Sequence, residues 1–295
     1  MSVLAVDWSG RRSGEQRYLW IAEAVDGVLV GLEAGRSRVA LVDHLIARVE
    51  ADPTLVVGFD FSFSLPAWFL DERGYATAPE LWDAATREGE EWLRSSAPPF
   101  WGRPGRPRPL LTEHFRITEA RIGAVGGIRP KSTFQIGGAG SVGTGSVRGF
   151  PALVRLRAAG FAIWPFDLPA RPPVVVEIYP RMLTGAVVKS DPAARIAHLD
   201  RHHAGLDPEL RDRAIASEDA FDAAVSSLVM SRYEPALRDL PPLHDPVVQR
   251  EGWVWSPPRG VGPDQADGCA FFTRTTDATM AGWSAVETST SEVYE

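Results

Sequence analysis

The chain has 295 residues, an apolar fraction of 44% and a formal net charge of −7 at pH 7, which is typical of a globular protein with one large domain or two smaller ones. The negative charge argues against general affinity for duplex DNA. The single cysteine, Cys269, excludes an intramolecular disulfide framework and a cysteine-rich zinc site. No segment is apolar enough over sufficient length to span a membrane, so we expect a cytoplasmic protein without a membrane partner.

The N-terminal region is expected to form three strands, a helix and a fourth strand. Asp26-Gly27 separates two alternating segments and is a strong hairpin signal, while Ser37 is a natural N-cap for the amphipathic helix. The five elements are expected at residues 3–6, 18–25, 28–32, 38–50 and 55–59. Because crossovers of this kind are right-handed, the fourth strand is expected to lie parallel to the first and beside it.

The rest of the chain is less regular. Residues 61–150 follow no simple pattern apart from a helical stretch at 80–93, and we interpret them as an insertion or lid within one domain at 1–255. Further helices are expected at 151–159, 192–203 and 218–231, with strands at 161–164 and 174–178. Residues 256–295 form a C-terminal extension, and its end has too little apolar content to be expected to order by itself.

Five carboxylates lie at the ends of expected strands or near the start of an expected helix. Asp7 and Asp60 terminate apolar strands that the topology places side by side, and Glu177 ends another strand. Asp219 and Asp222 lie three residues apart on one side of a helix and can reach one point. Ser217 is a natural N-cap for this helix, and acids in a first helical turn complement the helix dipole, but that explanation does not cover Asp222.

Convergent carboxylates cannot all ionise at short range unless cations neutralise them. Oxygen ligands without a nearby cysteine favour Mg²⁺ or Mn²⁺. A pair of such ions can stabilise both the attacking and the leaving oxygen in phosphodiester hydrolysis. The pattern therefore predicts a divalent-metal site at this edge of the sheet.

Four motifs, "VLAVDWSG", "VVGFDFSFSLP", "VVVEIYPR" and "EDAFDAAVSSL", together resemble an uncharacterised prokaryotic family of predicted nucleases with a ribonuclease H-like fold. The last motif also resembles the C-terminal helix of Holliday-junction resolvases. The resemblance covers about residues 1–255 and implies an α/β fold with a mixed five-stranded sheet, order 3-2-1-4-5, strand 2 antiparallel, flanked by helices. It implies metal ligands at Asp7, Asp60, Asp219 and Asp222, with Glu177 as a further catalytic acid.

We therefore expect a metal-dependent nuclease or phosphodiesterase acting on nucleic acid or another phosphodiester. Asp7 would bridge both metals, Asp60 and Asp222 would hold one each, and Asp219 or Glu177 would complete the shell. The substrate contacts are expected to come from Arg11, Lys131, Gln135 and Arg181. The segment 101–131, with seven basic and two acidic residues, is where a phosphate-bearing partner is expected to meet the chain, although a solvated Pro/Arg loop is the alternative.

Other signals leave alternatives open. Gly138 to Gly143 spells G-x-G-x-x-G, a dinucleotide fingerprint, but no buried strand precedes it and the helix is expected only from Pro151. The motif "DWSG" also resembles the first phosphate turn of sugar kinases and actin-like ATPases, which need this fold twice. His198, His202 and His203 have a spacing suited to zinc, yet no further ligand is evident nearby, which favours a polar helix face. A non-catalytic binding module is a further alternative.

Overall fold

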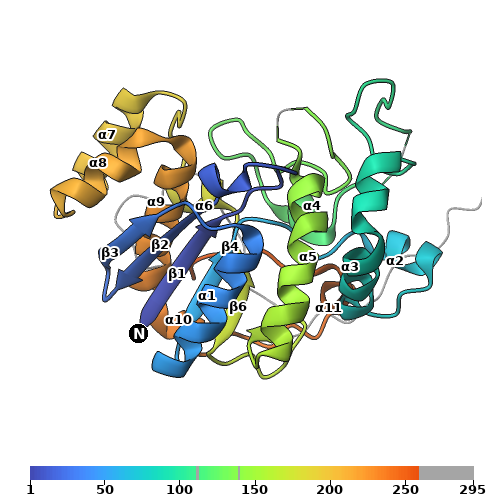
Figure 1. Ribbon diagram of the computed structural model, residues 1–295, viewed down its shortest axis with the longest axis horizontal. Coiled ribbons are helices and arrows are strands. Elements are labelled where there is room, and N and C mark those ends of the chain that lie inside the picture. The colour runs from blue at the N-terminus through green and yellow to red at the C-terminus, as the bar shows by residue number, and fades with distance from the viewer. Residues whose placement is uncertain (111–112, 139, 259–295) are drawn as a thin grey trace, which may run out of the picture.

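The computed structural model describes residues 1–110, 113–138 and 140–258. Their strands form one mixed sheet of six strands in the order β3-β2-β1-β4-β6-β5 (Figure 1). The strands are β1 (Ser2–Asp7), β2 (Trp20–Val25), β3 (Val28–Glu33), β4 (Val56–Phe59), β5 (Ala162–Ile163) and β6 (Val174–Glu177). The α/β class and the order of the first four strands are therefore confirmed.

The number of strands differs from the expected five. Strand β6 takes the place next to β4, and the two-residue strand β5 pairs in parallel with the far side of β6. Strand β2 is antiparallel to both β1 and β3, whereas β1, β4, β6 and β5 are parallel to one another. The short edge strand supplies only two pairing positions.

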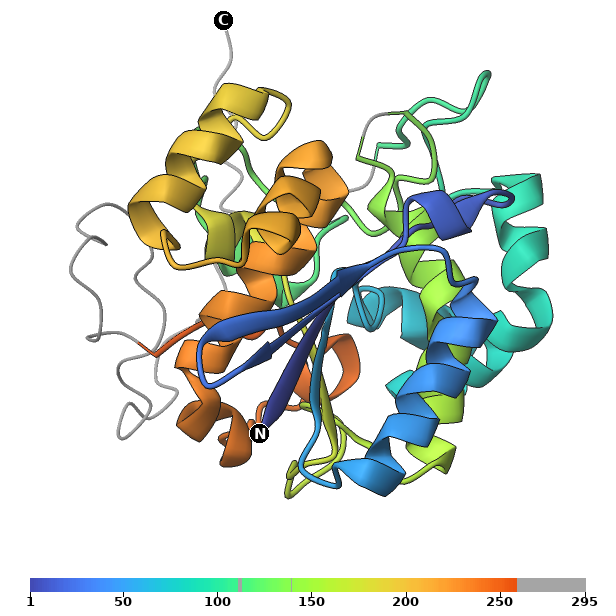
Figure 2. The same ribbon diagram turned by 60° about the vertical axis from the view of Figure 1, so that its left-hand side comes forward.

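Helices cover both faces of the sheet. Figure 2 shows the sheet nearly on edge, with α1 and α5 on one side and α9 on the other. The first half of the chain supplies η1 (Glu15–Arg17), α1 (Arg38–Ala51), α2 (Ala67–Arg73), α3 (Ala78–Ser95), α4 (Ile117–Arg121) and α5 (Val142–Ala158). The second half supplies α6 (Pro180–Thr184), α7 (Pro192–His202), α8 (Pro208–Ala216), α9 (Glu218–Arg232), α10 (Glu234–Arg238) and α11 (Val248–Glu251).

Two expected N-caps set the boundaries of the helices that flank the sheet. The Ser37 hydroxyl accepts a hydrogen bond from the Ala40 amide, and the Ser217 hydroxyl accepts one from the Ala220 amide. Each satisfies one amide that the first helical turn leaves without a backbone partner. The starts of α1 and α9 are therefore confirmed.

Helix α5 begins nine residues earlier than expected, at Val142 instead of Pro151. A proline after a glycine-rich run is typical of a helix start, but here Pro151 lies inside the helix. The preceding glycines allow the helix to pack closely, since a Cβ at Gly149 would lie 2.4 Å from the Phe61 ring. Tertiary packing thus overrides the low helix propensity of this segment.

Residues 61–150 share a core with the sheet. Trp82, Phe69 and Phe134 are fully buried in one apolar cluster with Val6 and Phe59 of the strands. Because these side chains cover one face of the sheet, this segment contributes to the same hydrophobic core as the strands. The parts of this segment that border the site come from α3, from the loop after it, and from the loop leading into α5 together with the start of that helix.

No helix in the described ranges is long and apolar enough to cross a membrane. The segment after α11 continues the fold, because Trp253, Val254 and Trp255 are buried and the Trp255 amide donates to the Glu177 carbonyl. The end of the C-terminal extension, whose order was predicted to be poor, lies outside the described residues, as does Cys269.

Three histidines gather where α7 meets α9. The His198 ring lies 4.7 Å from His202 and 5.8 Å from His203, measured between centroids. The Arg232 guanidinium lies 3.0 Å from Nδ1 of His203, so a cation already adjoins this ring. Burial, followed by the nearby positive charges, lowers the pKa of His203 to about 3 and that of His198 to about 4.

These histidines are expected to destabilise the fold in acid. Both are neutral in the folded chain, whereas an unfolded histidine takes up a proton below about pH 6.5. The contribution of these histidines to the stability of the fold is therefore fully present above that pH and is lost on acidification. At about pH 5 the buried His203 accounts for up to about 2 kcal/mol, and the half-buried His198 for less. Urea unfolding between about pH 7.5 and about pH 5 should show a smaller loss for His203→Gln than for wild type. The matched control is His202→Gln, an exposed neighbour, and an equal loss in all three proteins would contradict this.

Candidate active site

Three aspartates come from different elements and meet at the carboxyl end of β1 and β4. Val6 pairs with Phe59, so Asp7 and Asp60, the next residue of each strand, share the opposite face of the sheet. Helix α9 covers that face and brings Asp222. It packs closely there, because a Cβ at Gly58 would lie 2.7 Å from the Met230 sulfur.

Asp219, one turn earlier on α9, joins the edge of this group. Shielding from water, and then the negative charges of Asp60, Asp222 and Asp219, raise the pKa of Asp7 well above its usual value. Shielding and the charge of Asp222 likewise raise the pKa of Asp60 to about 7. The structure therefore brings together four of the five predicted acids, Asp7, Asp60, Asp219 and Asp222, and we call them the aspartate cluster.

Lys189 supplies the counter-charge within this cluster. Its ammonium group lies 2.6 Å from Oδ2 of Asp222, and its charge lowers the otherwise raised pKa values of Asp222, Asp60 and Asp7. The other carboxylate oxygen of Asp222, Oδ1, is buried without a hydrogen-bond partner in the described residues. The ammonium group of Lys189 therefore offsets the charge of three of the four carboxylates. The charge of Arg181 also acts on Asp222, and that of Arg11 acts on Asp219.

The side chains of the aspartate cluster are not arranged to coordinate a cation. In the described parts of the chain, no group of three or more His, Cys, Asp or Glu side chains is placed to hold a metal ion. The chemistry of the donors nevertheless fits a hard divalent cation, because they are carboxylate oxygens and one of them lacks a partner. Binding would require Asp7, Asp60 and Asp222 to turn toward a common point and Lys189 to share or release Asp222.

Glu177 lies on the other face of the sheet from the aspartate cluster, although its charge contributes to the raised pKa of Asp60. It pairs with Phe59 across the sheet, so its side chain lies on the face opposite to Asp7 and Asp60. There it is buried against Arg116, whose Nη1 donates to Oε2 at 2.9 Å, and Oε2 also accepts from the Phe63 amide at 2.9 Å. These contacts give Glu177 a structural role in holding the segment after β4.

Arg116 is the centre of this buried ion network. Its guanidinium is completely buried and pairs with both Glu177 and Glu119. It also donates to the Glu251 carbonyl, while the Glu251 carboxylate accepts from the amides of Ala67 and Ile117. Arg116 therefore cannot belong to a surface for phosphate, although it is one of the basic residues counted in the segment 101–131.

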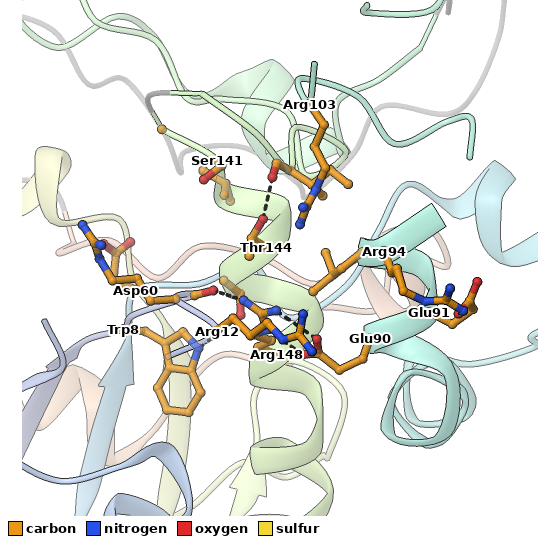
Figure 3. A pocket seen from close by; sticks show the side chains of 17 residues that line it. Trp8, Arg12, Asp60, Glu90, Glu91, Arg94, Arg103, Ser141, Thr144 and Arg148 are labelled. Atoms are coloured by element: carbon orange, nitrogen blue, oxygen red, sulfur yellow. Dashed lines mark hydrogen bonds and ion pairs between the residues drawn. The ribbon is translucent and has the colours of Figure 1, made fainter. Parts of the chain in front are cut away.

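A cleft of about 840 Å³ opens beside the aspartate cluster. Asp60 belongs to both, and Figure 3 shows it with the residues that line the cleft from the loop after β1, from α3 and from α5. Five arginines line it: Arg11, Arg12, Arg94, Arg103 and Arg148. We call it the arginine cleft.

Close backbone packing fixes one wall of the arginine cleft. A Cβ at Gly10 would lie 2.6 Å from the Gly145 amide nitrogen, so only glycine lets this loop rest on α5. The Trp8 indole donates to the Gly145 carbonyl at 3.1 Å, and Arg148 donates to the Gly10 carbonyl. The loop that carries Arg11 is thereby held against α5.

The four predicted substrate contacts have different surroundings. Arg11 lines the arginine cleft and stacks on Tyr18, with 3.8 Å from its guanidinium carbon to the ring centroid. Lys131 is exposed and its side chain runs along Gly140, which lines the cleft. Gln135 donates to the Gly137 carbonyl at 3.2 Å, and Arg181 donates to the Val187 carbonyl at 2.7 Å.

The glycine-rich loop leads straight into α5, so the expected gap between the loop and the helix is wrong. The first helical amides are nevertheless engaged, since those of Val142, Gly143 and Thr144 donate to carbonyls of Gly140, Gln135 and Ser141. The segment before the loop forms an isolated bridge between Trp101 and Gln135 instead of a strand. This arrangement does not favour a dinucleotide site at the loop.

No family model, curated protein or solved structure matches this chain.

Sequence patterns did not reveal several residues of the site. Lys189 stands in a loop before α7 without any motif, and only the packing of that loop against α9 places it beside Asp222. Tyr179 follows the expected "EIYP" acid; burial and the charge of Asp60 raise its pKa to about 12. Arg12, Arg94 and Arg148 lie on separate segments, and only the tertiary structure gathers them.

Proposed function

We propose that this protein is a divalent-metal-dependent phosphodiesterase that cleaves nucleic acid, built on a ribonuclease H-like arrangement of its sheet and of α9. The observation that carries the proposal is the aspartate cluster, in which Lys189 offsets the charge of three of the four carboxylates and Asp222 has a buried oxygen without a partner among the described residues. Such an excess of negative charge is stabilised by a divalent cation.

Asp7, Asp60 and Asp222 are the residues that would hold Mg²⁺ or Mn²⁺, with Asp219 at the edge. Asp7 takes the central place, because the other three aspartates all raise its pKa. When bound, such an ion supplies charge stabilisation to a phosphate and activates water at neutral pH. The arrangement of Glu177 assigns it to support of the fold instead of to this set.

Two other side chains are placed to serve the substrate. Tyr179 keeps its proton at neutral pH, since its pKa is raised to about 12, and can donate a hydrogen bond to a phosphate oxygen. Burial and the charge of Glu218 raise the pKa of Asp219, and Arg11 lies close enough to offset part of this rise. Its guanidinium can therefore contact a phosphate at the border of the aspartate cluster.

The test needs no substrate. Crystals soaked in millimolar Mn²⁺ should show anomalous scattering peaks among Asp7, Asp60 and Asp222, and crystals of Asp222→Asn should show weaker peaks or none. Peaks would then justify a cleavage screen with single-stranded and duplex DNA and RNA. No peak in an open, unobstructed site would favour a non-catalytic binding module on the same sheet.

A further inference from the structure

We propose that the arginine cleft holds a single strand of nucleic acid by its phosphate groups and leads its backbone to the aspartate cluster. This inference deepens the proposed function and rests on it for the assignment of what is cut. The cleft itself is large enough for more than one phosphate group, because about 840 Å³ lies toward the upper end of small-ligand sites.

The charges in the cleft leave three arginines available. Arg148 pairs with Glu90 at 2.6 Å, and Arg94 pairs with Glu91. Arg11, Arg12 and Arg103 form no salt bridge with another residue that the structure describes. The charge of Arg11 still acts on Asp219 and that of Arg12 on Glu90. In a chain with a net charge of −7, three unpaired cations in one concave site favour an anionic ligand.

The three available arginines approach from opposite walls. Arg11 and Arg12 belong to the loop after β1, whereas Arg103 reaches down into the cleft from the loop after α3, as Figure 3 shows. Cations on separate walls match a ligand with several separated phosphates better than a single phosphate. A single strand of nucleic acid that runs along the cleft presents such a row of charges.

The lining favours recognition of the backbone over the bases. Trp8, the one aromatic residue among the lining side chains, is 7% exposed and its indole nitrogen donates to the Gly145 carbonyl. A base therefore has no open ring to stack on within the described lining. We infer that binding is largely independent of base sequence and depends strongly on salt.

Asp60 connects the arginine cleft to the aspartate cluster. It lines the cleft and also belongs to the aspartate cluster, so a strand that follows the arginines passes the proposed metal ligands. The arginines therefore bind the phosphates beside the bond to be cut, and the aspartates are the residues that would hold the metal ion for the cleavage.

The experiment measures binding separately from cleavage. The anisotropy of a fluorescein-labelled DNA strand of about 12 nucleotides is followed in EDTA between about 50 and 200 mM salt. Wild type should bind the strand without metal. The double variant Arg12→Gln/Arg103→Gln should bind about tenfold or more weakly, and its plot of log K against log salt should be shallower by about 1.4, or about 0.7 for each lost phosphate contact.

The matched control is Arg201→Gln on α7, an exposed arginine outside the cleft lining, which should leave both quantities unchanged. An unchanged affinity and salt slope in the double variant would overturn the inference. A mononucleotide that competes as well as the strand would also overturn it, because it would show that a single phosphate suffices. Binding that depends on the two arginines in a protein without a Mn²⁺ site would instead refute the proposed function and leave this inference standing.

Discussion

Replacing Asp7 with asparagine is expected to abolish metal-dependent cleavage while making the folded chain more stable. The rate should fall by more than about 100-fold, because even a residue that only supports a metal ligand contributes 10–100-fold in many metal sites. The neutral amide keeps the size of the side chain and removes one negative charge from the aspartate cluster. Activity equal to that of wild type would contradict the assignment of Asp7 as a metal ligand.

The gain in stability follows from the sign of the pKa shift. The pKa of Asp7 is raised in the folded chain, so the favourable contribution of its protonated form is present at low pH and is lost as the pH rises through the folded-state value. At neutral pH the wild type carries that penalty and the Asp7→Asn protein does not. Its melting temperature should therefore be higher, by an amount that grows as the pH rises above about 4.

Added metal and a matched control variant distinguish the loss of metal binding in Asp7→Asn from its gain in stability. Added Mg²⁺ should raise the melting temperature of wild type, because a ligand that binds only the folded state stabilises it, and should have less effect on Asp7→Asn. The control is Asp212→Asn, an exposed acid on α8, which should change neither cleavage nor the response to metal. A lower melting temperature for Asp7→Asn in the absence of metal would show that its carboxylate supports the fold.

Replacing Arg116 with methionine is expected to destabilise the fold by about 3–5 kcal/mol. The substitution keeps most of the volume but leaves Glu119 and Glu177 buried without their cation. It also removes the donor to the Glu251 carbonyl at the end of α11, so α4, β6 and α11 lose the side chain that links them. Urea or thermal unfolding measures the loss.

An exposed pair provides the control for Arg116. Arg238 pairs with Glu234 on α10, and its side chain is 56% exposed, so Arg238→Met should cost less than about 1 kcal/mol. The second variant Arg116→Met/Glu177→Gln should recover part of the stability, because one of the two orphaned charges is removed. Equal effects of Arg116→Met and Arg238→Met would show that the buried network contributes no more than a surface pair.

Local patterns alone were enough to predict much of the framework. Alternation around Asp26-Gly27 indicates the hairpin of β2 and β3, Ser37 and Ser217 mark the starts of two helices, and the order of the first four strands follows from the handedness of the crossover. The same order predicts that Asp7 and Asp60 are neighbours, because parallel strands end at the same edge of a sheet.

The surroundings of each side chain depended on contacts between distant segments. The expected role of Glu177 assumed that strand-end acids share one side, whereas the register of β4 and β6 turns it to the opposite face, toward Arg116. The start of α5 was misplaced because propensity favours a helix that begins at Pro151, while packing against Phe61 and Gly10 requires the glycines that precede it.

The sequence by itself determined the order of the first four strands, the main helices and four of the acids of the proposed site, because these depend on residues close in the chain or on general rules of connection. Only the tertiary structure decided that Lys189 meets Asp222, that Arg116 is buried and that five arginines line one cleft. The physical reason is that periodicity and capping are local properties of the backbone. The partner of a charged side chain, in contrast, depends on which distant segments the core packs together.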